Sequence, residues 1–281
     1  MSFTAADVMK LRDRTKLPMM ECKAALAASG GDFEKAVTDL RTKFAAVQGK
    51  FADREAAEGR ATVYIDRGAK TGAIVEVRCE TAPSAKSDQF VALVADVAKQ
   101  VAVKNPATVE ALLAEPFLGD AKKTINDRVL ETIGLIRENM KVHKFKRLEG
   151  TLGEYRHHDG SVAVIVSVEG ENASPELLRD VCMHIAARSP VAARKEDVPA
   201  DVIAKETDIA KDQVANDPKN KSKPANILEK IVEGKLKTFF AENVLLEQPF
   251  VKDDSKTVGQ LLAGAGLTLK TFIRYKVGEV G

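Results

Sequence analysis

Apolar residues in the first 45 positions recur at helical spacing, in three short runs separated by turn residues. Thr4, with Asp7 three residues later, has the spacing of a capping box at the start of the first run. Gly30-Gly31 ends the second run, and Asp32 is suited to cap the third. The third run has one apolar face, made of Phe33, Ala36, Val37, Leu40 and Phe44. The pattern predicts a small three-helix bundle.

After this bundle the hydrophobic period changes from helical to alternating. Residues 46–60 are polar without an apolar face, which predicts a partly helical linker. Residues 61–66 and 73–79 alternate and flank a glycine-containing turn, which predicts a β-hairpin. A second helix over 121–138 and a strand over 142–148 complete the unit. Between hairpin and second helix, a first helix is expected to bury Phe90, Val94, Val97 and Val101.

The same order of elements recurs in the second half of the chain. Residues 152–156 and 161–168 flank another turn, a helix follows, and residues 272–277 form a closing strand. Short motifs also repeat: Pro116-Phe117-Leu118-Gly119-Asp120 with Pro249-Phe250-Val251-Lys252-Asp253, and Lys123-Thr124-Ile125 with Lys256-Thr257-Val258. The chain therefore predicts two duplicated α+β subdomains, 61–148 and 149–281, each a small antiparallel sheet covered by helices on one face.

The second repeat carries an insertion over residues 200–243. Two helical patterns, 200–216 and 225–243, are separated by a polar run with two prolines. Apolar positions of the two helices can face each other: Ile203, Ile209 and Val214 on one, Ile227, Ile231 and Leu236 on the other. A helical hairpin with so small a core is expected to project from the body.

Composition narrows the class of protein. The 281 residues include 43 Lys and Arg against 41 Asp and Glu, a net charge of +2, so no basic nucleic-acid surface is expected. No apolar run is long enough for a membrane helix, and the chain enters its first helix at once, so neither a membrane segment nor a targeting peptide is expected. The three cysteines, Cys22, Cys79 and Cys182, are odd in number and far apart in the sequence. This spacing predicts reduced thiols in a cytoplasmic protein.

Motifs for catalysis and cofactor binding are missing from the sequence. It contains no phosphate-binding glycine loop and no Cys-x-x-Cys pair, so no direct nucleotide binding, no cofactor and no enzyme activity are expected. The spacing of His157, His158, Cys182 and His184 does not predict a closed metal shell. His184 is expected to pack at the edge of the core, and His157 is either a partner contact or a solvated turn residue.

Met19 and Met20 indicate a docking surface on the bundle. Neighbouring residues point about 100° apart on a helix, so one methionine can enter the core while the other is exposed. Flexible, polarizable methionine side chains suit partner surfaces as well as cores. Leu11 is expected to lie half in the core and half in the contact, with Arg12 beside it on the surface.

Motifs along the whole chain resemble those of the bacterial elongation factor Ts family. They are Leu11-Arg12-Asp13-Arg14-Thr15, Met19-Met20-Glu21-Cys22-Lys23-Ala24-Ala25-Leu26, Gly31-Asp32, Glu247-Gln248-Pro249-Phe250 and Arg274-Tyr275-Lys276-Val277-Gly278-Glu279. The resemblance implies an N-terminal ubiquitin-associated-like bundle, a projecting coiled-coil arm, and guanine-nucleotide exchange on elongation factor Tu. It also implies partner contacts at Leu11, Arg12, Met19, Met20 and His157.

One motif departs from that family. Where the family typically reads Cys-x-Thr-Asp-Phe-Val-Ala-Lys, this chain has Cys79-Glu80-Thr81-Ala82-Pro83-Ser84-Ala85-Lys86. The family's Phe wedges into elongation factor Tu near its magnesium ion, with the Asp beside it, so Thr81, Ala82, Pro83 and Ser84 are expected at the contact with a changed wedge. A plain strand-to-helix turn, with Ser87 as a helix cap, is the other interpretation.

A different class of function is a scaffold whose bundle binds a helix or a ubiquitin-like partner without exchange activity. That alternative leaves the duplicated core and the helical arm unexplained. Release of labelled GDP from elongation factor Tu separates the two.

Overall fold

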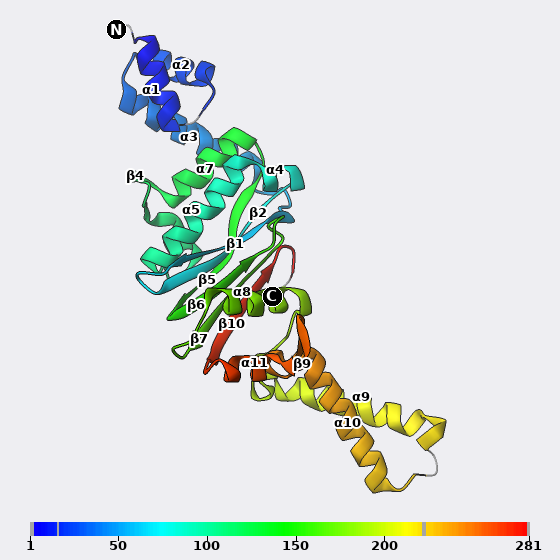
Figure 1. The fold of residues 1–281 in the computed structure, drawn as a ribbon. Helices are drawn as coiled ribbons and strands as arrows, with labels where there is room; N and C mark the ends of the chain where they lie inside the picture. The colour runs from blue at the N-terminus through cyan, green and yellow to red at the C-terminus, as the bar shows by residue number, and fades with distance from the viewer. Residues whose placement is uncertain (1–2, 16, 221–222, 280–281) are drawn as a thin grey trace.

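The chain forms an elongated molecule with three parts in a row (Figure 1). The computed structural model describes residues 3–15, 17–220 and 223–279, and leaves out the side chains of residues 44, 45, 47 and 48. A helical bundle lies at one end, two sheets with their helices form the middle, and a helical arm projects at the other end (Figure 1). None of the described helices combines the length and apolar content needed to cross a bilayer.

The N-terminal bundle consists of α1 (Ala5–Thr15), α2 (Met19–Ala28) and α3 (Phe33–Phe51). The predicted capping box is present, because the Thr4 amide donates to Asp7 Oδ2 at 2.8 Å and the Asp7 amide donates to Thr4 Oγ1 at 3.3 Å. Asp32 caps α3. The first part of the expected partly helical linker, from residue 46, is the end of α3, which contacts α7 and stays helical to Phe51. Phe44, the last residue of the predicted apolar face of this helix, lies outside the described side chains.

The first repeat is an antiparallel sheet with helices on one face. β1 (Glu58–Asp66), β2 (Thr71–Cys79) and β5 (Met140–Glu149) pair in the order β1-β2-β5, and the covering helices are α5 (Asp88–Lys104) and α7 (Ile125–Ile136). The predicted inward face of α5 is buried. The expected helix from residue 121 begins only at Ile125, because β4 (Asp120–Thr124) pairs with β3 (Pro116–Phe117). A short helix, α6 (Val109–Ala114), precedes this hairpin and was not predicted.

The second repeat has the same strand order. β6 (Thr151–Arg156), β7 (Val162–Glu169) and β10 (Thr268–Lys276) pair as β10-β7-β6, so the second strand of the hairpin is central in both sheets. β8 (Pro249–Phe250) and β9 (Asp253–Thr257) pair in the register of β3 and β4, and the helices are α8 (Pro175–Arg188) and α11 (Val258–Gly264). Capping boxes at Thr124 and Thr257 open α7 and α11. The predicted duplication is confirmed at the level of strand order.

The two sheets pack face to face, with their helices on the outer faces (Figure 1). The apolar layer between them contains Ala61, Val63, Ile74, Leu152, Ala163, Ile165 and Tyr275. Gly72 permits this close approach, because a Cβ there would lie 2.8 Å from Cδ1 of Leu152 and 3.1 Å from Cδ1 of Ile165. The middle of the molecule therefore has four layers, helix, sheet, sheet and helix.

The arm is the predicted helical hairpin, with α9 (Ala200–Asn216) and α10 (Ala225–Asn243). Val214 is buried between the helices, whereas Ile209 and Ile227 are 39% and 38% exposed. Among the described residues, α10 has none that is fully buried. The 3₁₀ turns Lys195–Asp197, Pro218–Asn220 and Leu245–Glu247 lie in or beside the arm.

Candidate docking surfaces

Met19 and Met20, the methionine pair, are both exposed at the start of α2. Their exposed fractions are 47% and 72%, so neither of them enters the core, although helical spacing allowed one to do so. The inward positions are filled by Leu17, Cys22 and Leu26, which are at most 1% exposed. Leu17, two residues before Met19, is part of the apolar core of the bundle, whereas the methionine pair is not.

Leu11 is wholly inside the bundle, which corrects the expectation of a half-exposed residue. Its exposed fraction is 0%, because it faces the apolar cluster shared by α1, α2 and α3. Arg12, the next residue, is exposed as expected. Of the bundle residues proposed from the sequence, Arg12 and the methionine pair are therefore at the surface, and Leu11 is part of the core.

Thr81, Ala82, Pro83 and Ser84 lie where β2 passes into a short helix, α4 (Ala82–Lys86). Thr81 is the N-cap, and its Oγ1 accepts a hydrogen bond from the Ser84 amide at 3.4 Å. Proline fits the first helical turn because its missing amide has no partner there. Ala82 and Pro83 are exposed, so the proline ring presents a small apolar surface. Ser87 caps α5, as the alternative interpretation expected.

Glu138, which the sequence analysis did not single out, contacts this segment. Its carboxylate accepts hydrogen bonds from the Thr81 amide at 3.1 Å, the Thr81 hydroxyl at 2.7 Å and the Ser84 hydroxyl at 2.6 Å. Glu138 follows Arg137, the left-handed C-cap of α7. The hydrophobic pattern has no signal for such a contact, because the residue lies in a connection and its partners are far away in the chain.

His157 lies in the second repeat, just after β6, and is half-buried. Its Nδ1 is 3.0 Å from the Tyr155 hydroxyl, and its ring centroid is 4.4 Å from that of His158. The candidate residues therefore fall into two groups. One group lies on the bundle and α4, and His157 lies on the other sheet.

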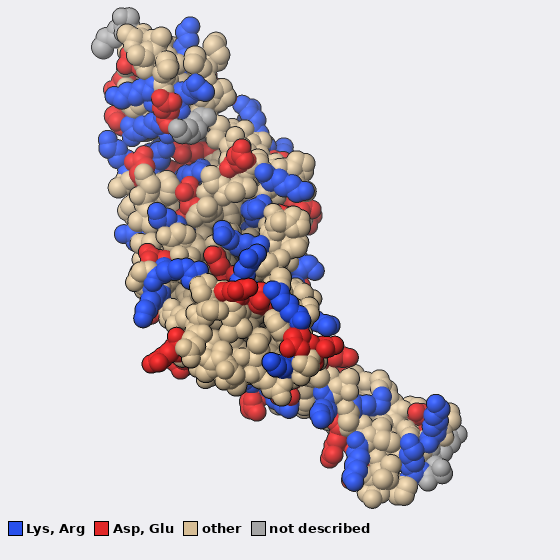
Figure 2. All heavy atoms as spheres, viewed as in Figure 1, with Lys and Arg blue, Asp and Glu red and all other residues tan. Residues whose placement is uncertain are grey.

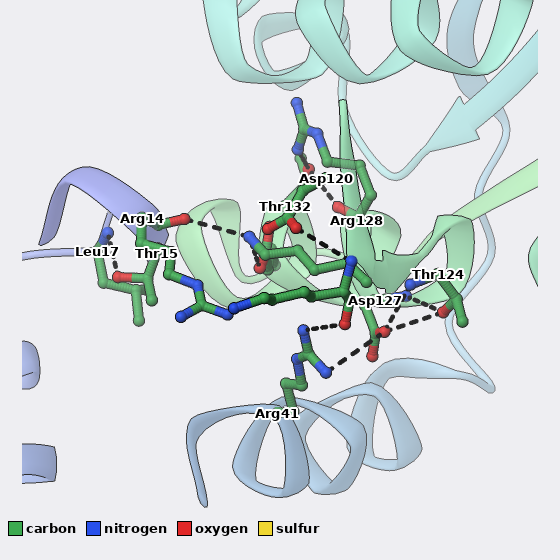
Figure 3. A network of polar contacts seen from close by, with 12 residues as sticks. Arg14, Thr15, Leu17, Arg41, Asp120, Thr124, Asp127, Arg128 and Thr132 are labelled. Atoms are coloured by element: carbon green, nitrogen blue, oxygen red, sulfur yellow. Dashed lines mark hydrogen bonds and ion pairs between the residues drawn. The ribbon is translucent and has the colours of Figure 1, made fainter. Parts of the chain in front are cut away.

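The bundle is held on the first repeat by a buried polar network (Figure 3). Lys123 Nζ lies 2.6 Å from Glu131 Oε1 and donates to the Arg14 carbonyl at 3.1 Å. Arg41 of α3 donates to the Lys122 carbonyl at 2.9 Å. Burial raises the pKa of Glu131, and the neighbouring Lys123 ammonium opposes this shift. These bonds hold the bundle, and with it the methionine pair, in a fixed position relative to the first repeat.

The remaining histidine and cysteine candidates are structural. His184 is fully buried, as part of the core rather than its edge, with Nε2 2.9 Å from Gln248 Oε1 and Nδ1 accepting from the Val251 amide at 3.2 Å. Burial raises the pKa of the Cys79 thiol to about 12 and raises that of Cys182 as well. In the described part of the chain, no group of three or more His, Cys, Asp or Glu side chains could hold a metal ion.

Charges of both signs are interspersed over the visible face of the molecule (Figure 2). Lys and Arg lie beside Asp and Glu over the bundle as well as over the core (Figure 2).

Comparison with known proteins agrees with the architecture. The family model described as elongation factor TS matches residues 80–279. Elongation factor Ts of Thioalkalivibrio sulfidiphilus is 44% identical over 283 residues, covering 99% of this chain and 93% of the relative. The relatives from Methylococcus capsulatus and Halothermothrix orenii are 43% and 37% identical, each with the same coverage. A chain that shares sequence with these proteins over almost its whole length belongs to the elongation factor Ts family of translation elongation factors.

Proposed function

We propose that this protein binds elongation factor Tu in the cytoplasm and accelerates the release of GDP from it. Membership of the elongation factor Ts family over almost the full chain is the observation that carries the proposal. The proposed contacts are Arg12, Met19, Met20, Thr81, Ala82, Pro83, Ser84 and His157, with Leu11 supporting them from the core.

Nucleotide exchange of this kind is a coupling between two binding equilibria. A protein that binds the nucleotide-free GTPase more tightly than the GDP form must weaken GDP binding by the same factor. The chain therefore needs no nucleotide pocket and no catalytic group of its own. It needs contact surfaces that are held in place on the two sides of a partner.

The separated positions of the proposed contacts support such a mechanism. One set lies on the bundle and α4, and His157 lies after β6 in the second sheet. Two separated contacts allow binding energy gained at one surface to be used for distortion at the other. We assign the first set to the GTPase domain and the second repeat to a β-barrel domain of the partner.

Ala82 and Pro83 replace a carboxylate and an aromatic ring at the proposed wedge. Proline has a fixed φ and presents an apolar ring at low entropic cost, but it is smaller than phenylalanine. We therefore expect exchange to rely more on the other contacts, and the double change Ala82→Asp with Pro83→Phe to raise the rate of GDP release without unfolding the exposed segment.

The test uses elongation factor Tu loaded with a fluorescent GDP. Acceleration of release by substoichiometric amounts of this protein supports the proposal. Stoichiometric binding without release supports the scaffold alternative instead. Abolition of exchange by the Ala82→Asp and Pro83→Phe changes, with the fold preserved, would show that the Ala-Pro pair is itself the working wedge.

A further inference from the structure

We propose that Arg137, Glu138 and Asn139, between α7 and β5, hold the bundle and the segment 81–84 in one arrangement, with Glu138 as the positioning residue of that segment. The inference rests on the proposed function, because it concerns how the docking surfaces are presented. Each of the three side chains contacts a different part of the molecule.

Glu138 fixes the segment that carries Ala82 and Pro83. One carboxylate accepts three hydrogen bonds, from the amide and hydroxyl of Thr81 and from the hydroxyl of Ser84, at 2.6 to 3.1 Å. Thr81 caps α4, so Glu138 and the cap bracket the exposed Ala82 and Pro83. Hydrogen bonds to an ionised carboxylate are stronger than those between neutral groups. The exposed pair therefore sits on a backbone held by a side chain distant in sequence.

Asn139 joins the same place to the connection between the bundle and the first sheet. Its backbone amide donates to Glu80 Oε1 at 2.6 Å. Its side-chain Nδ2 donates to the carbonyls of Ala52 and Arg54 at 3.3 and 2.7 Å. Asn139 itself is 7% exposed, and the three bonds are partly buried. The end of α3 and the residue before Thr81 are thereby held by one side chain and its backbone.

Arg137 contacts the bundle itself. Its Nη2 lies 3.2 Å from Oε1 of Glu21, the residue after Met20. Arg137 has φ of 63°, in the left-handed region, which turns the chain out of α7 and allows Glu138 to follow toward α4. The pair with Glu21 is largely exposed and so contributes little stability by itself. Its proposed role is to orient α2 of the bundle relative to the end of α7.

The consequence for docking is preorganisation. A free segment 81–84 would have to be ordered when the partner binds, and this ordering would reduce the affinity. With Glu138 in place, the segment is ordered beforehand at a defined position relative to the methionine pair. Glu138 therefore acts on nucleotide exchange through Thr81 and Ser84 and does not itself contact the partner.

The first test examines the free protein by amide hydrogen exchange. Glu138→Ala should speed exchange of the amides of Thr81, Ser84 and Ala85 by about tenfold, because the bonds that hold the segment are lost. The exposed Glu171→Ala serves as the control and should leave these amides unchanged. Unchanged protection in Glu138→Ala would overturn the inference, whatever the function of the protein.

The second test measures GDP release from elongation factor Tu. Glu138→Ala should lower kcat/KM for release by about tenfold while thermal unfolding changes little, and Glu138→Gln, which keeps one acceptor oxygen, should lie between. In a Thr81→Ala and Ser84→Ala background, Glu138→Ala should have a much smaller effect, because its hydroxyl partners are already gone. Equal effects in both backgrounds, or faster amide exchange with unaltered GDP release, would overturn the inference. Absence of release with the unmodified protein would instead refute the proposed function.

Discussion

Leu11 and Met20 belong to the same small bundle but differ in their surroundings. Leu11 is 0% exposed and Met20 is 72% exposed. We expect Leu11→Ala to lower the free energy of unfolding by about 2–5 kcal/mol, and Met20→Ala by less than about 0.5 kcal/mol. Urea unfolding measures these two differences in stability.

Joint replacement of Met19 and Met20 by Ala should weaken the partner complex by about 1–3 kcal/mol. A binding titration with elongation factor Tu measures this loss. Unfolding of the bundle in the methionine variant would contradict the assignment.

His184 makes stability depend on pH. Nδ1 accepts from the Val251 amide, so the neutral ring carries its proton on Nε2 and donates to Gln248. Burial lowers the pKa of His184 from 6.5. Below this value the unfolded chain takes up a proton that the folded chain does not, so stability is lost as pH falls through about 6.5.

Urea unfolding between about pH 7.5 and pH 5.5 checks this prediction. We expect His184→Gln to be less stable at the upper pH but to lose less stability on acidification. The exposed His158→Gln should keep the pH dependence of the unmodified protein. The same loss on acidification in His184→Gln and the unmodified protein would show that other groups cause it.

At the scale of elements, the arm begins and ends at the same place in the second repeat. The Val191 amide donates to the Asn243 carbonyl, and the Leu245 amide donates to the Ala192 carbonyl, both at 2.9 Å. Val198, Val244 and Ala192 form a small apolar cluster at this base. The outer part of the arm makes little contribution to the core, so it should be removable.

We expect a variant in which a short Gly-Ser linker replaces residues 207–237 to keep the four-layer core folded. Circular dichroism and cooperative thermal unfolding measure the fold, and GDP release then measures what the arm adds to exchange. Loss of cooperative unfolding would show that the arm stabilises the core.

At the scale of the whole molecule, Lys123 of the first repeat joins the core to the bundle, because its ammonium pairs with Glu131 and donates to the Arg14 carbonyl of α1. Lys123→Met should destabilise the protein by about 3–5 kcal/mol, because it leaves the Glu131 charge buried without its partner. Adding Glu131→Leu should restore part of this loss. Thermal unfolding of the two variants measures the difference, and a double variant as unstable as the single one would contradict the argument.

The candidate site could be predicted only in part. Periodicity and the family resemblance identified Arg12, the methionine pair, segment 81–84 and His157, and these residues are exposed or half-buried in the structure. The same reasoning expected Leu11 to lie only half in the core, and it allowed Met19 or Met20 to enter the core. Helical spacing indicates which residues share a face, but it does not show that Leu17, outside the helices, enters the core while the methionine pair stays exposed.

The sequence by itself determined the longer helices and strands, the first caps and the duplication, because each depends on residues a few positions apart or on repeated motifs. Capping boxes, turn glycines and the two hairpins need no distant partner. Only the tertiary structure decided the continuation of α3 to Phe51, the burial of Leu11 and the contacts of Glu138. Glu138 and Thr81 are 57 positions apart, and no local pattern records that they meet. Their contact arises because β2 and β5 pair in one sheet, which brings the start of α4 beside the end of α7.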